Sequence, residues 1–120
     1  MTLTGLPQLP PSPVGLLASV TTEGETTIVT LCGEADVFTL PTVVEVLARV
    51  IAERDGAVIV DMTHTGFIDS STVEALERAS QFLDDRGRTL RLRSPSAMAA
   101  RVLALLGLAD LIEPELTTAN

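Results

Sequence analysis

The run Asp69-Ser70-Ser71-Thr72 is the part of the sequence best suited to chemistry, because it combines a carboxylate with three hydroxyls. It follows an apolar stretch, residues 57–62, and opens a segment with helical spacing. A serine at a helix start lies beside backbone N–H groups that lack a partner within the helix, and these groups favour negative charge. The run therefore indicates either a serine that accepts a phosphoryl group or a set of helix caps.

A nucleophilic serine would need a general base, and His64 is the only histidine in the sequence. It lies in the loop just before the serines, and no G-x-S-x-G turn surrounds Ser70 or Ser71. We therefore expect His64 to be an exposed loop residue and the protein not to be an enzyme. The single Cys32 can form no internal disulfide, and we expect it to be a small core residue within a strand.

Carboxylates suggest a second kind of site, because Asp36, Asp61 and Asp69 could meet at one sheet edge and hold Mg²⁺. They could also form a phosphoryl-accepting aspartate site, but such a site usually uses a lysine, and every basic residue in this chain is arginine. A phosphate-binding loop is not indicated either, because Gly66 stands alone. We favour the interpretation that Asp69 caps a helix and Asp61 caps a turn, and we expect no metal ion and no cofactor.

The serines themselves allow two interpretations. Ser71-x-x-Glu74 fits a capping box, in which the hydroxyl only stabilises the helix start. Alternatively, one serine accepts a phosphate, which carries a charge of about −1.5 to −2 and is stabilised by a helix N-terminus. On an acidic surface the added charge would repel an acidic partner group or block an apolar contact. These residues alone do not decide between the two interpretations.

The elements that position this run begin with a predicted hairpin. Residues 16–20 predict a first strand, and residues 26–32, which are rich in β-branched residues, predict a second. A glycine-containing turn separates them, so we expect an antiparallel pair. Residues 33–36 break the second strand. A helix is expected to begin near residues 39–41, since proline suits a first turn, and to end at residues 55–56. Its predicted inner face consists of Val43, Val44, Leu47, Val50 and Ile51.

The second half of the chain alternates strands and helices. Residues 57–62 form a continuous apolar strand, 70–85 an amphipathic helix, 89–93 an alternating strand, and 94–107 a third helix. Inner positions of the two helices are Val73, Leu76, Ala79, Phe82 and Leu83, and then Met98, Val102, Leu105 and Leu106. In the last strand, Leu90 and Leu92 should face the core while Arg91 and Arg93 face water.

This pattern predicts an α/β fold in which helices flank a small mixed sheet, in the order β-β-α-β-α-β-α. Right-handed crossover makes the strands at 57–62 and 89–93 parallel. In open sheets of this kind, functional sites lie at the carboxyl ends of strands and the starts of helices. Asp36 and the Asp69 run both occupy such places.

The length of 120 residues suits one domain, which we place at 15–113, after a flexible proline-rich lead, 1–14, and before a frayed tail, 114–120. The net charge is −8 and the pI is near 4.4. Nucleic acid and anionic membranes are therefore unsuitable partners, whereas a protein with a basic face is suitable. No apolar run approaches the roughly 18 residues of a membrane span, and the N-terminus lacks the features of a secretory signal, so we expect a cytoplasmic protein.

Three stretches together resemble the STAS domain family, and more narrowly the bacterial anti-sigma factor antagonists. They are Gly33-Glu34-Ala35-Asp36, the run Phe67-Ile68-Asp69-Ser70-Ser71 after a V-I-V-D strand, and Ser94-Pro95 with Arg101-Val102-Leu103 and Leu106-Gly107-Leu108. The resemblance covers about residues 15–113. It implies a small mixed sheet flanked by helices and a regulator of transcription, as in stress responses, that acts by protein–protein interaction.

The resemblance also implies a mechanism. In the family, the unphosphorylated antagonist binds an anti-sigma factor that is a GHKL-type serine kinase, and this releases the sigma factor. The kinase phosphorylates the second serine of D-S-S, and a PP2C-type phosphatase reverses the reaction. Carried over to this sequence, the acceptor is Ser71, and the partner-binding residues are Asp36, Asp69, Ser70, Thr72 and Glu74.

The sequence departs from the family after D-S-S, where many members have glycine. Here Thr72 and Glu74 add bulk and charge where a kinase would approach, so Ser70 and Thr72 are alternative acceptors. The same departure supports a second function: an accessory or structural STAS subunit of a lipid-transport or stressosome-like assembly, without efficient phosphorylation.

Overall fold

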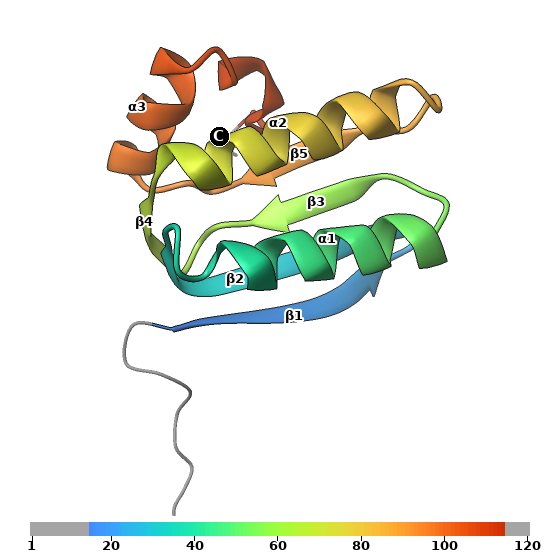
Figure 1. Ribbon diagram of the computed structural model, residues 1–120. Helices are drawn as coiled ribbons and strands as arrows, with labels where there is room; N and C mark the ends of the chain where they lie inside the picture. The colour runs from blue at the N-terminus through green and yellow to red at the C-terminus, as the bar shows by residue number, and fades with distance from the viewer. Residues whose placement is uncertain (1–14, 115–120) are drawn as a thin grey trace, which may run out of the picture.

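A computed structural model describes residues 15–114, and the predicted lead 1–14 and all but one residue of the predicted tail lie outside the described residues. Within this range a five-stranded mixed sheet is combined with three α-helices, which confirms the predicted fold class (Figure 1). The elements are β1 (Leu16–Glu23), β2 (Thr26–Ala35), α1 (Leu40–Glu53), β3 (Val58–Asp61), β4 (Thr65–Ile68), α2 (Ser70–Asp84), β5 (Leu90–Arg93), α3 (Ala97–Leu105) and the 3₁₀ helix η1 (Ala109–Leu111).

The sheet starts with the predicted hairpin, in which β1 pairs antiparallel with β2. The tight turn between them places Gly24 at φ 61, a left-handed conformation that glycine adopts without strain. From β2 the strand order continues through β3 to β5, and both of these pairings are parallel, as predicted for the two strands in the second half of the chain.

β2 is longer than predicted, because it continues through the Gly33–Ala35 stretch that we expected to break it. Its first half pairs with β3 along residues 27–30, and its second half pairs with β4 along residues 33–35. Gly33 makes this change possible: the register shifts beside it, and its φ of 129 suits only glycine.

The short strand β4 adds an element that the predicted order lacked. It occupies Thr65–Ile68, within the segment that we predicted to be a loop. Its burial pattern is buried, exposed, exposed, buried, so the alternation that reveals a strand in a sequence is absent. β4 exists because the second half of β2 offers it backbone partners.

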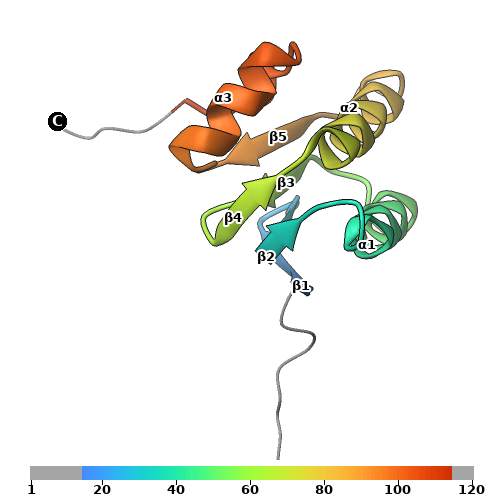
Figure 2. The same ribbon diagram turned by 60° about the vertical axis from the view of Figure 1, so that its left-hand side comes forward.

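α1 and α2 lie together on one side of the sheet, and α3 stands apart from them beyond β5 (Figure 2). The core between these elements is a single cluster that includes Val29, Leu31, Val60, Leu76 and Leu92. Within residues 15–114 no helix is both long and apolar enough to cross a membrane.

Several predicted core positions are wrong. Val44, Phe82, Met98, Leu105 and Leu106 are 40–80% exposed, at 48%, 43%, 61%, 79% and 47%. In α3 the buried residues are instead Ala99 and Leu103, so the helix turns a different face toward the core from the one predicted. Cys32 is exposed, because it lies on the opposite face of β2 from the buried Leu31.

Candidate functional site

The starts of α1 and α2 are brought together by the pairing of β2 with β4. Ala35 and Ile68 are partners at the ends of these two strands, and the Asp69 N–H donates to the Ala35 carbonyl at 3.0 Å. The paired strands β2 and β4 therefore end side by side (Figure 1), and Asp36 and Asp69 are the residues that follow them, as expected for a site in an open sheet.

Asp69 is the N-cap of α2 and binds two neighbours through one oxygen. Its Oδ1 accepts from the Thr72 N–H at 3.1 Å and from the Ser71 hydroxyl at 2.7 Å. Partial burial disfavours the charged carboxylate, but hydrogen bonds from Ser71 and Thr72 outweigh this effect and lower the pKa of Asp69. The prediction that Asp69 caps the helix is confirmed.

The capping-box interpretation of Ser71-x-x-Glu74 is wrong, because the cap is two residues earlier in the chain. Ser71 is the second residue of α2, half-buried, and its hydroxyl hydrogen points to Asp69 rather than to the backbone. Ser70 and Glu74 are exposed. The Ser71 hydroxyl therefore does not cap the helix backbone and instead binds the carboxylate that does.

Thr72 differs from the two serines because it is fully buried. Its hydroxyl donates to the Ala35 carbonyl at 3.2 Å, which ties α2 to the end of β2. The expectation that Thr72 adds bulk at the surface is therefore wrong. Its burial also argues against Thr72 as a phosphate acceptor or a partner contact, and this leaves Ser71 and Ser70.

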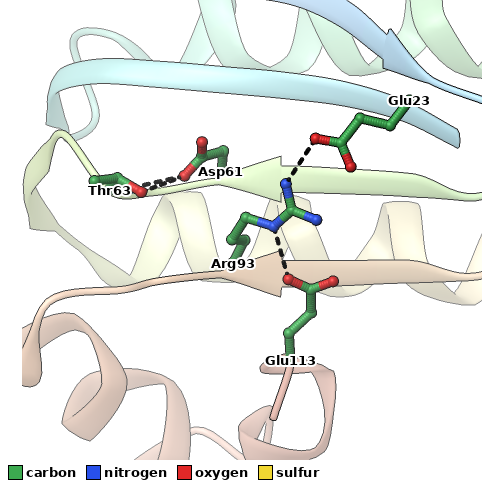
Figure 3. Close-up of polar contacts among 5 residues, drawn as sticks. All are labelled: Glu23, Asp61, Thr63, Arg93 and Glu113. Atoms are coloured by element: carbon green, nitrogen blue, oxygen red, sulfur yellow. Dashed lines mark hydrogen bonds and ion pairs between the residues drawn. The ribbon is translucent and has the colours of Figure 1, made fainter. Parts of the chain in front are cut away.

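Asp36 uses its carboxylate within its own loop. Its Oδ1 accepts from the N–H groups of Phe38 at 2.9 Å and Thr39 at 3.1 Å, just before α1. Asp61 likewise accepts from the Thr63 N–H at 3.0 Å and the Thr63 hydroxyl at 2.6 Å, so it caps a turn as predicted (Figure 3). Each of the three aspartates thus serves the backbone of its own turn or helix start.

Two further threonines hold the site and were not singled out from the sequence. The Thr39 hydroxyl donates to the Glu34 carbonyl at 2.8 Å, and the Thr65 hydroxyl donates to the Leu31 carbonyl at 2.8 Å. With Thr72, three hydroxyls therefore bind carbonyls in the second half of β2. The available signal was their position, since each threonine stands at or next to an element start.

Apolar side chains surround these caps at the surface. Val37 is 57% exposed and Phe38 is 83% exposed in the loop before α1, and Phe67 in β4 is 43% exposed. His64 is exposed in the turn before β4, as predicted for a loop histidine. A negatively charged helix start and exposed aromatic side chains in the loop before α1 and in β4 are features of surfaces that bind proteins.

Solved structures share this fold at low sequence identity. An anti-sigma factor antagonist from Mycobacterium paratuberculosis has 20% sequence identity to this chain and a TM-score of 0.78. The match covers 88% of this chain and 91% of that protein's chain. The anti-sigma factor antagonist SpoIIAA in its unphosphorylated form is 19% identical, with coverages of 81% and 86% and a TM-score of 0.70. The Bacillus cell fate determinant SpoIIAA in its phosphorylated form is 20% identical, with coverages of 81% and 89% and a TM-score of 0.66.

A search of curated protein sequences gives no match to the chain. The family model of the STAS domain, by contrast, matches residues 18–120, which is most of the sequence. The match includes β2, β4, the start of α2 and α3, the same elements that carry the motifs described above. The chain therefore belongs to the STAS domain family.

Proposed function

We propose that this STAS domain is an anti-sigma factor antagonist, a non-enzymatic regulator that binds an anti-sigma factor and thereby releases a sigma factor. Membership of the STAS family and the likeness of the fold to anti-sigma factor antagonists support this role. The exposed apolar side chains Val37, Phe38 and Phe67 beside the start of α2 are the contact surface in this proposal.

The switch in this proposal is Ser71, phosphorylated by a GHKL-type anti-sigma kinase and restored by a PP2C-type phosphatase. The observation that carries it is the 2.7 Å hydrogen bond from the Ser71 hydroxyl to Asp69. Ser71 is half-buried at a helix start, whereas Thr72 is fully buried, so a kinase reaches Ser71 more readily. Ser70 is the alternative acceptor because it is exposed.

Phosphorylation of Ser71 would weaken partner binding for a physical reason. A phosphate adds a charge of about −1.5 to −2 next to the Asp69 carboxylate, on a surface that is already acidic. Burying that charge against an apolar contact surface costs more free energy than burying a neutral hydroxyl. The α2 N-terminus offsets part of the repulsion, so the domain stays folded while the contact is lost.

The test begins with phosphoryl transfer from ATP by the cognate anti-sigma kinase, followed by mass mapping of the modified residue. We expect modification at Ser71, its loss in Ser71→Ala, and its retention in the matched control Ser70→Ala. Calorimetric titration should then show that the phosphorylated protein binds the kinase at least about tenfold more weakly. Equal affinity of the two forms would rule out the switch.

The second function, an accessory STAS subunit of a lipid-transport or stressosome-like assembly, gives a different result. No transfer to Ser70 or Ser71 would then be seen, and the protein would co-purify with a transporter ATPase or a large oligomer. Glu74 is relevant to this choice because it is exposed one turn after the serines. Replacing Glu74 with glycine should raise the phosphoryl-transfer rate if its charge repels the kinase.

A further inference from the structure

A groove runs between α1 and α2, and its lining residues extend from Val44 and Ala75 toward the C-terminal ends of the two helices. Its volume is about 530 Å³. From α1 it is lined by Val44, Leu47, Ala48, Ile51 and Ala52, and from α2 and the following turn by Ala75, Arg78, Ala79, Phe82, Arg86 and Arg88. Both helices lie on the same side of the sheet (Figure 2).

Most of the residues that line the groove are apolar, and four of them are alanines. Ala48 and Ala52 are one turn apart on α1, and Ala75 and Ala79 are one turn apart on α2. Such positions let another helix approach closely. Val44 and Phe82 also line the groove and are 48% and 43% exposed, although our sequence prediction placed both in the core. The groove thus leaves apolar surface uncovered.

The charges at the rim are all of one sign. Arg78, Arg86 and Arg88 line the groove and no acidic side chain does, although the chain has sixteen acidic residues and eight basic ones. The Arg86 guanidinium lies 3.6 Å from the centre of the Phe82 ring and donates to the Phe82 carbonyl at 3.1 Å. Arg78 forms no ion pair with any described residue. The basic rim is therefore open to an acidic partner.

We propose that this groove binds one amphipathic helix of a partner protein, whose apolar stripe is flanked by aspartate or glutamate residues. The apolar floor receives the stripe, and Arg78 and Arg86 pair with the flanking carboxylates. A symmetric dimer through the same groove would bring together two surfaces that each carry these arginines and no acidic lining residue, so charge complementarity favours a different chain.

This surface goes beyond the contact proposed around Ser71. Phe82 is eleven residues after Ser71, which is about 16 Å along the helix. Of the groove residues on α2, only Ala75 lies within about one turn of Ser71, so we expect binding in the groove to depend little on the state of Ser71.

The test is an NMR titration of the ¹⁵N-labelled protein with a helical probe peptide of about 18 residues, with a leucine stripe flanked by glutamates. A second probe has every glutamate replaced by lysine. We expect the acidic probe to shift amide signals from residues 44–52 and 75–88, and the lysine probe to bind at least about tenfold more weakly. The double variant with Arg78→Glu and Arg86→Glu should bind the acidic probe more weakly than the wild type, by a similar factor.

Two controls make the result specific. Arg101→Glu makes the same kind of charge change on α3, outside the groove, and should leave probe binding unchanged. Ser71→Glu should also leave it unchanged, so this result is separable from the fate of the Ser71 proposal. Ala48→Glu, at an exposed floor position, should abolish probe binding without unfolding the domain.

Three outcomes would overturn the proposal: no shifts with the acidic probe, shifts centred on residues 66–74, or equal binding of both probes. Sedimentation that shows a dimer disrupted by Ala48→Glu would assign the groove to a second copy of this chain. Shifts with laurate, in the absence of shifts with the peptide, would assign it to a small amphiphile. Either result would contradict the proposal that the groove binds a helix of a partner protein.

Discussion

At the scale of single residues, Asp69 joins the fold to the candidate switch. One carboxylate oxygen accepts from the Thr72 backbone and from the Ser71 side chain. This much could be predicted locally, since aspartate before a helix is a common N-cap. Which of the hydroxyls is accessible could not be predicted locally. Thr72 is buried, and its hydroxyl donates to the carbonyl of Ala35, a residue 37 positions earlier in the chain.

The lowered pKa of Asp69 leads to a prediction about acid stability. The folded state favours the charged carboxylate more than the unfolded chain does, so the stabilisation is complete above the unfolded pKa of about 4. It is lost as the pH falls through the lower, folded-state pKa. We expect the wild type to be more stable than Asp69→Asn near neutral pH. Urea unfolding should show this difference shrinking toward about pH 3, and a constant difference would contradict the assignment.

At the scale of elements, the sequence predicts a helix or strand well where the spacing of its apolar residues matches the face that is buried in the fold. The hairpin, the parallel strands and the start of α2 follow from residue patterns that are local in the chain. β4 and the second half of β2 do not, because each forms only against the other. The same reason explains the wrong face of α3: Ala99 and Leu103 are buried by neighbouring elements, while hydropathy alone favours Met98 and Leu105.

Arg88 links two elements and gives a second prediction. Its guanidinium donates to the carbonyls of Ile51, Arg54 and Gly56 at 3.2, 2.7 and 3.0 Å, and so caps the C-terminus of α1. Arg88→Ala should lower the free energy of unfolding by about 1–2 kcal/mol. Arg88→Lys should recover only part of this, because an ammonium group cannot reach all three carbonyls. Urea unfolding of the three proteins measures both effects.

At the scale of the whole molecule, contacts between residues far apart in the sequence hold the elements together. Arg93 lies on β5 between Glu23, at the end of β1, and Glu113, after η1 (Figure 3). The closer contact is Nε to Glu113 at 2.8 Å, and Nη1 reaches Glu23 at 3.3 Å. These bonds raise the pKa of Arg93. We predicted this side chain to face water, and it is only 30% exposed.

Because both contacts of Arg93 lie near the surface, they should be modest and sensitive to salt. We expect Arg93→Met to lower the free energy of unfolding by about 1 kcal/mol at low ionic strength. The loss should become smaller in about 0.5 M NaCl, where charges are screened. Urea is the suitable denaturant because it adds no ions. Arg91→Met is the matched control, since within residues 15–114 the Arg91 side chain bonds only to the Asp110 carbonyl. A loss of equal size there would contradict the role of the ion pairs.

The bond between Ser71 and Asp69 also couples modification to protons. The hydroxyl hydrogen that now stabilises the Asp69 carboxylate would be absent once a phosphoryl group occupies that oxygen. With this donor replaced by nearby negative charge, the pKa of Asp69 would be lowered less than in the unmodified chain, although the Thr72 hydrogen bond would remain. The stabilisation that this carboxylate gives to the fold would then be lost at a higher pH in the phosphorylated protein than in the unmodified one. Phosphorylation of Ser71 would therefore change the acid stability of the domain as well as its surface charge.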